Sequence, residues 1–110
     1  MSTPIPASDE DFFVQIERGN ALCEKLSATE VPTGDDRYRY IGLGVECVEA
    51  YESAHGSLVR ISTAGKGRVA DLYRVEADFY GAKSREVLRD LLSSLPAADR
   101  GDVRLAALAR

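Results

Sequence analysis

Residues 68–95 read RVADLYRVEADFYGAKSREVLRDLLSSL, and this stretch decides the predicted fold. Its apolar residues recur three or four positions apart in two runs: Val69, Leu72, Val75 and Phe79, then Val87, Leu88, Leu91, Leu92 and Leu95. This spacing places each run along one side of an α-helix. We therefore expect helix over 68–95, packed through both runs, although Gly81 could end a first helix there. Pro96 then stops the chain from continuing as helix.

An earlier helix is predicted over residues 9–28. Phe12, Ile16, Gly19, Cys23 and Leu26 follow one another at helical steps. Ser8 is a suitable N-cap, and the acidic residues that follow it suit the positive end of the helix dipole. Residues 1–7 contain two prolines, so we expect them to form a disordered arm in front of a single domain over residues 8–110.

Residues 36–55 fit two structures. Ile41, Val45, Val48 and Tyr51 have helical spacing, but Ile41, Leu43, Val45 and Cys47 also alternate with polar residues and glycines as in a strand. We favour a helix over 36–55 that ends near Gly56, with a further short helix starting at Ser57. The alternative is an α+β domain with a short antiparallel sheet from residues 38–47, 58–63 and 68–79.

These helices can bury their apolar sides only against one another, so the predicted fold class is all-α, a small bundle of three to four helices. A last short helix is expected after Asp102, whose carboxylate can cap it.

Composition sets limits on the function. The chain has 110 residues, 14 Lys and Arg against 18 Asp and Glu, and a net charge of −4. It has no basic stripe that would neutralise phosphates and no long apolar run, so we expect no nucleic-acid partner and no membrane insertion. Cys23 and Cys47 lie on predicted apolar helix sides, and no secretion-signal pattern precedes them. Both are therefore expected to be free thiols in a small acidic cytoplasmic protein.

Glu49, Glu52 and His55 are candidate metal ligands. Glu52 and His55 are three positions apart, so on a helix they point the same way. Glu52-x-x-His55 resembles half of the di-iron site of ferritin-like bundles, in which two helices each supply this motif and two others supply a glutamate. The resemblance covers four residues. It implies iron or another divalent metal in a symmetric dimer, because the chain has a single histidine.

Two further segments are candidate binding sites. Lys66 and Arg68 stand in a glycine-rich turn where backbone amides and basic side chains could hold an anion. Arg37, Tyr38, Arg39 and Tyr40 form a cluster of the residue types that are enriched at protein interfaces.

No arrangement of nucleophile and base is recognisable, so we expect a protein that is not an enzyme and has no cofactor. The predicted function is that of a small cytosolic interaction protein of the accessory-subunit, immunity or inhibitor type. It would bind a protein partner and also itself as a homo-oligomer, most simply a dimer. The alternative function is the dimeric metal-binding bundle described above.

Overall fold

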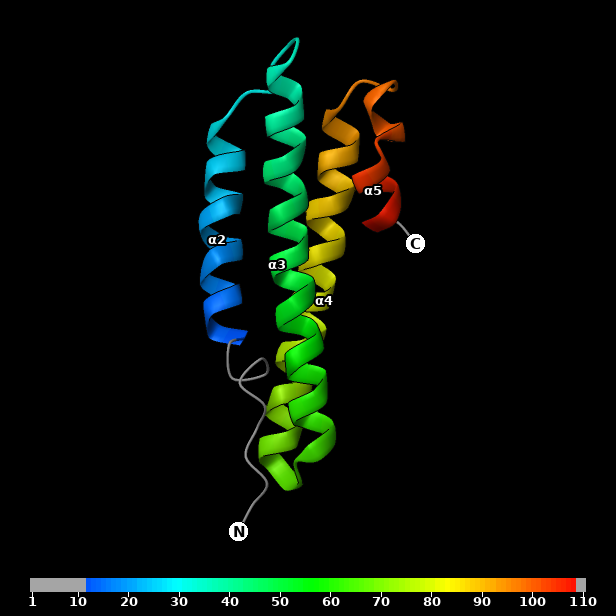
Figure 1. The fold of residues 1–110 in the computed structure, drawn as a ribbon. Coiled ribbons are helices and arrows are strands. Elements are labelled where there is room, and N and C mark those ends of the chain that lie inside the picture. The colour runs from blue at the N-terminus through cyan, green and yellow to red at the C-terminus, as the bar shows by residue number, and fades with distance from the viewer. Residues whose placement is uncertain (1–11, 109–110) are drawn as a thin grey trace.

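The computed structural model describes residues 12–108, and this part of the chain is an all-α bundle (Figure 1). Its elements are α2 (Phe12–Ala28), α3 (Asp36–Ala64), α4 (Gly67–Ser94), a 3₁₀ turn η1 (Asp99–Gly101) and α5 (Val103–Leu108). The predicted fold class is confirmed. No strand occurs within residues 12–108, so the α+β alternative is wrong. The predicted arm over 1–7 and the Ser8 cap lie outside the described residues.

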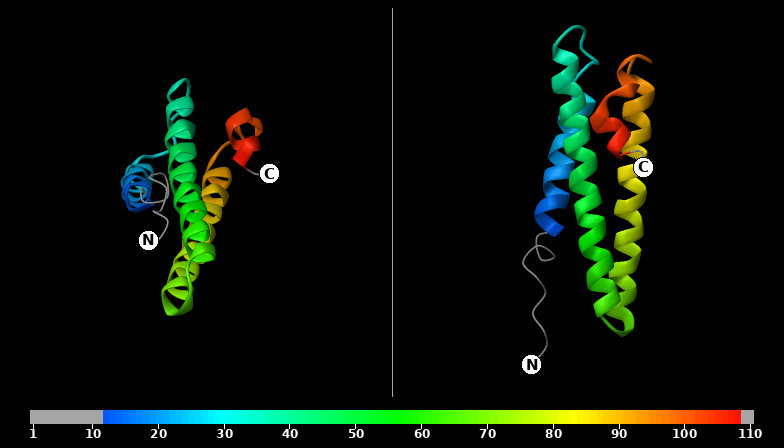
Figure 2. Two further views of the ribbon diagram at one scale, coloured as in Figure 1. Left: turned by 60° about the horizontal axis from the view of Figure 1, so that its bottom comes forward. Right: turned by 45° about the vertical axis from the view of Figure 1, so that its right-hand side comes forward.

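α3 is the central element of the bundle. It is 29 residues long, about 43 Å at 1.5 Å per residue. It packs against both α2 and α4, and its upper half also contacts α5 (Figures 1 and 2). The predicted end near Gly56 is wrong, because α3 continues unbroken to Ala64. Ser57 and Leu58 are buried directly after the glycine, so tertiary packing holds this turn in helical conformation.

The α3–α4 connection is short. Gly65 and Lys66 link the two helices, and Gly67 begins α4 with a φ of 71°. Glycine adopts this left-handed conformation at little cost, which explains its position at the turn. α4 then runs through Gly81 without interruption and ends at Ser94, two residues before Pro96, as the proline predicts.

The core has two parts along α3. The lower cluster contains Phe12, Ile16, Ala54, Leu58, Ile61 and Ala77. The upper cluster contains Tyr40, Ile41, Val45, Leu91, Leu95 and Leu105. The predicted apolar sides of α2 and of residues 87–95 therefore do face the core. Asp102 caps α5 as predicted, because its Oδ1 accepts a hydrogen bond of 2.9 Å from the Arg104 backbone N–H.

Two glycines let the helices approach closely. A Cβ at Gly44 would lie 2.6 Å from Cδ2 of Leu91, which is buried on α4. A Cβ at Gly19 would lie 2.8 Å from Cε1 of the buried Tyr51 ring. Both distances are too short for real carbon atoms, so any side chain at these positions would push α3 away from its neighbours.

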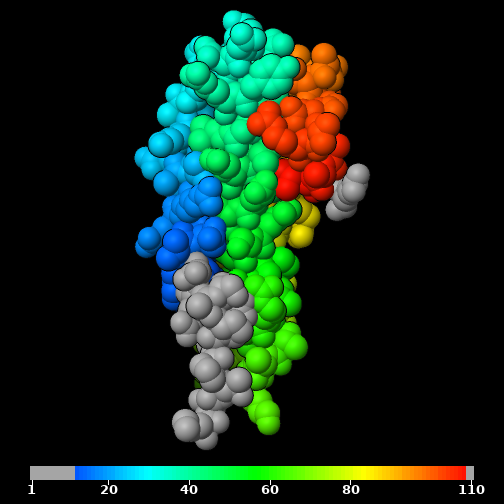
Figure 3. All heavy atoms as spheres, viewed as in Figure 1, coloured from blue at the N-terminus to red at the C-terminus, as the bar shows by residue number. Residues whose placement is uncertain are grey.

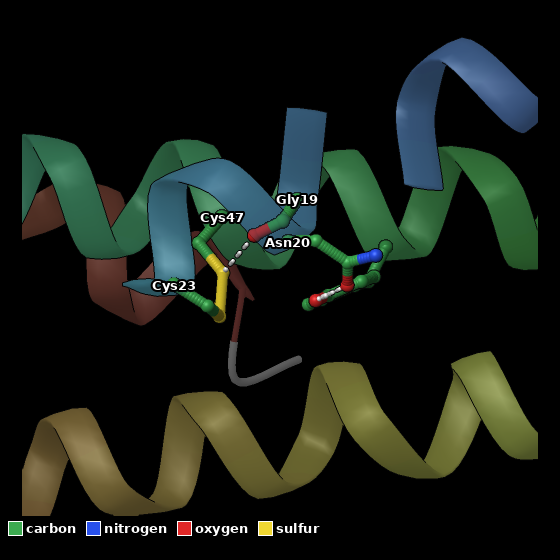
Figure 4. Close-up of a disulfide and its surroundings, with 5 residues drawn as sticks. Gly19, Asn20, Cys23 and Cys47 are labelled. Atoms are coloured by element: carbon green, nitrogen blue, oxygen red, sulfur yellow. Dashed lines mark hydrogen bonds between the residues drawn. A yellow bond between two sulfur atoms is a disulfide. The ribbon is translucent and has the colours of Figure 1, made fainter. Parts of the chain in front are cut away.

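Cys23 and Cys47 form a disulfide between α2 and α3, with their Cα atoms 5.9 Å apart (Figure 4). The prediction of two free thiols is therefore wrong. The pattern correctly placed both cysteines on inward helix sides, but it could not show that the two sides meet. Cys47 is fully buried and its Sγ lies 3.4 Å from the Gly19 carbonyl oxygen, so the reduced thiol would be placed to donate a hydrogen bond there.

Candidate functional site

Four large apolar side chains lie exposed on α4. They are Val69, Leu72, Val75 and Phe79, with exposed fractions of 60%, 67%, 67% and 58%. We call this set the α4 apolar stripe. Sequence periodicity predicted that it packs in the core, and that prediction is wrong. Contiguous exposed apolar surface on a soluble protein is typical of an interaction site.

The stripe is exposed because α4 has two sides that could pack on α3, and the side with small residues does so. Ala70, Ala77, Gly81 and Ser84 are buried, and they allow a close approach of α3 and α4. The larger residues are thereby turned outward. The α3–α4 hairpin also extends beyond the start of α2 (Figure 1). In this region α2 reaches α4 through the edge-to-face contact of the Phe12 and Tyr73 rings, whose centroids are 6.2 Å apart.

Charged residues of both signs border the stripe. Lys66 and Arg68 lie at its start, Asp71 and Arg74 lie along it, and Glu76 and Asp78 lie towards its end, and all six are exposed. Two basic residues therefore come first and two acidic residues come near the end. At that end the Lys83 Nζ also lies 5.8 Å from the centroid of the Phe79 ring, a cation–π contact at the edge of the apolar surface.

The predicted interface cluster at the start of α3 is divided between surface and core. Tyr40 is buried in the upper cluster. Arg37 forms an ion pair with Asp99, with 2.8 Å between Nε and Oδ2, and this pair holds η1 against α3. Tyr38 and Arg39 are exposed. Two of the four predicted residues therefore support the fold, and two remain available to a partner.

The Glu52-x-x-His55 motif lies on one side of α3, as the spacing predicts. Both residues line a cavity of about 500 Å³ together with Ser84 and Arg85 of α4. The His55 Nδ1 lies 2.6 Å from the Ala77 carbonyl oxygen, which requires Nδ1 to carry the proton and leaves Nε2 as the free acceptor. Burial raises the pKa of the Glu52 carboxyl, as does nearby Glu49, while His55 lowers it.

This motif does not amount to a metal centre within one chain. Among residues 12–108 no group of three or more His, Cys, Asp or Glu side chains is arranged to hold a metal ion. Glu49 does not line the cavity that contains Glu52 and His55. Lys66 and Arg68, the predicted anion site, are both exposed at the turn before α4.

Sequence reasoning missed a second surface feature, a groove between α4 and the η1–α5 segment. Arg85, Arg89 and Arg100 line it together with leucines from α4 and α5. The spacing of Arg85 and Arg89 shows that they share a helix side, but only the turn after Pro96 brings Arg100 to them. The exposure of the α4 apolar stripe was also not predicted. The recurrence of small residues at Ala70, Ala77 and Gly81 was the signal that this side of α4 packs against α3.

Comparison of the chain with known protein families, with curated proteins and with solved structures finds no match. None of the helices within residues 12–108 combines the length and the apolar character needed to cross a membrane. The candidate function therefore depends on the surface of this chain alone.

Proposed function

We propose that this protein is a protein-binding module that associates with a second copy of itself through the α4 apolar stripe. The observation that carries the proposal is the exposure of Val69, Leu72, Val75 and Phe79 on one side of a long, regular helix. A helix side of this kind presents its anchors in a straight row, and a second helix is the element that such a row fits.

The free energy that the stripe can contribute is similar in size to the cost of association. Full burial of one such side chain contributes about 1.5–3 kcal/mol, and the four are 58–67% exposed. Burying the stripes of two copies would then contribute about 8–15 kcal/mol. Association itself costs about 4–15 kcal/mol in lost freedom of motion. The two quantities are similar, so the affinity depends on each side chain of the stripe.

The charges favour an antiparallel arrangement of the two α4 helices. In that orientation Arg68 of each copy approaches Asp78 of the other, near both ends of the stripe. A parallel arrangement would place like charges together. Ion pairs at the border of an interface contribute little affinity, about 0.2–1 kcal/mol each, but they select the orientation.

Sedimentation velocity over a wide concentration range tests the self-association, and charge reversal tests the orientation. Arg68→Glu and Asp78→Arg should each weaken the dimer, because each places like charges face to face. The double variant restores the opposite-charge pairs in exchanged positions and should recover most of the affinity. A protein that stays monomeric at every concentration overturns the proposal, and a double variant weaker than both single variants overturns the antiparallel arrangement.

One contact favours the second candidate function, a dimeric metal-binding bundle. The Ala77 carbonyl fixes the His55 ring so that Nε2 is the free acceptor, which is how many metal-binding histidines are oriented. A second copy would have to supply further ligands. Elemental analysis of freshly purified protein tests this directly, and the absence of iron, manganese and zinc, with a melting temperature unchanged on their addition, dismisses it.

The compartment in which the protein works follows from its redox state. The cytoplasmic prediction depended on two cysteines with no secretion-signal pattern before them, and it implied free thiols, which the Cys23–Cys47 disulfide contradicts. We propose that the protein works where this bond can form. Thiol labelling under non-reducing conditions in the native host tests the proposal. If two cysteines per chain are labelled, the disulfide is absent there and the protein works in a reducing compartment.

A further inference from the structure

The groove between α4 and the η1–α5 segment has a volume of about 690 Å³. Leu88 and Leu92, which are half-buried, form its accessible apolar surface, and the fully buried Leu105 borders it. Exposed arginines stand around it, and we call it the arginine groove. Figure 2 shows α5 beside the upper half of α4, which is its C-terminal half. Figure 3 shows α5, in red, on the side of α3 away from α2.

Within residues 12–108 none of the three arginines of the arginine groove is held in an ion pair. No ion pair in this part of the chain involves Arg85, Arg89 or Arg100, whereas Arg37, Arg74 and Arg104 are each paired with an aspartate. Arg100 donates from Nε to the Leu95 carbonyl at 3.3 Å, a bond that does not use its terminal nitrogens.

Two of these charges also repel each other. Arg85 and Arg89 are one helical turn apart on the same side of α4, a spacing that is destabilising for like charges. The chain as a whole has a net charge of −4, whereas all the charged side chains that line the groove are arginines. An anion bound in the arginine groove would relieve the repulsion.

We propose that the arginine groove binds a small organic anion with an apolar tail, of the fatty-acid or alkyl-phosphate class. Guanidinium groups bind carboxylate and phosphate in pairs of hydrogen bonds, which suits the head of such a molecule. The leucines suit the tail. The volume falls within the usual range of small-molecule sites, about 300–1,000 Å³. This site is independent of the α4 apolar stripe, because it lies on the other half of α4.

NMR titration of the full chain tests the proposal with decanoate and decyl phosphate, each kept below the concentration at which it forms micelles. We expect saturable binding, with amide shifts confined to residues 85–93 and 100–106. Decanol, which has the tail without the charge, and acetate, which has the charge without the tail, should bind at least tenfold more weakly. The tighter of the two decyl anions identifies the head group that the arginine groove prefers.

Variants separate this site from general surface effects. Arg89→Gln should weaken decanoate binding about fivefold, as expected for one lost charge-assisted contact at a solvent-exposed site. Ala106→Trp should abolish binding by filling the groove without changing its charge. Arg74→Gln removes an exposed arginine of α4 outside the groove and should leave the affinity unchanged. Absence of binding by both decyl anions, equal binding of decanol, or equal weakening by Arg74→Gln overturns the inference.

Discussion

Replacing Leu72 with alanine gives the sharpest test of the self-association proposal. The side chain is 67% exposed, so its loss costs the fold of one chain less than it costs the proposed dimer. In the proposed dimer the same surface is buried against a second copy. The variant therefore separates affinity from stability, which few core substitutions can do.

The magnitude follows from the number of carbons removed. Leucine to alanine deletes three carbons, each contributing about 0.8 kcal/mol when fully transferred from water. Since about two-thirds of this surface is available for burial, the loss is about 1.6 kcal/mol per copy and about 3 kcal/mol per symmetric dimer. The dissociation constant should rise roughly 150-fold.

Sedimentation equilibrium measures the dissociation constant of the dimer. Thermal unfolding should be measured on dilutions of the same preparations, at a concentration where the wild type is monomeric. The free energy of unfolding of the monomer should change by less than about 1 kcal/mol, because only about one third of the side chain is buried in one copy. Val103→Ala is the matched control, because Val103 is 82% exposed but belongs to α5. It should leave the dimer intact. The reasoning fails if the two variants weaken the dimer equally, or if Leu72→Ala leaves the dissociation constant within threefold of the wild type.

Three further predictions concern the fold. Reduction of the Cys23–Cys47 disulfide should lower the free energy of unfolding by about 3.5 kcal/mol, estimated from the separation of 24 residues between the cysteines. Urea unfolding with and without reductant measures this, and a change below about 1 kcal/mol would contradict it. Gly44→Ala should destabilise the protein, because its Cβ would meet a buried leucine of α4. Gly42→Ala should stabilise the protein by up to about 1 kcal/mol, because its Cβ would meet only the end of a flexible arginine side chain. If the two variants shift the melting temperature in the same direction, the packing argument is wrong. The pKa of Asp102 is lowered, first by the hydrogen bonds from the arginine side chain two residues later. Its contribution to α5 is therefore complete above the ordinary pKa of aspartate and is lost as the pH falls through the lowered value. The amide-exchange protection factors over residues 103–108, which are corrected for the intrinsic pH dependence of exchange, should therefore fall in acid in the wild type but not in Asp102→Asn.

Local sequence patterns determined the helices themselves. The three-and-four spacing of Phe12, Ile16 and Leu26 identified α2 and the side of it that packs. Pro96 and Asp102 marked where α4 ends and α5 begins. These features depend on contacts within a few residues along the chain, so they can be recognised without knowing what packs against what.

The functional surfaces depended on tertiary structure. The lower half of α4 has a large apolar side and a side of small residues, and periodicity alone cannot say which one meets α3. Close packing chose the small side and left Leu72 and Phe79 in solvent.

The same limit applies to contacts between distant segments. Cys23 meets Cys47, and Arg100 joins Arg89, only because separate elements are brought together by the bundle. The spacing of residues along the chain determines which of them share a side of a helix. Whether that side is buried or exposed depends on how closely whole helices can approach one another.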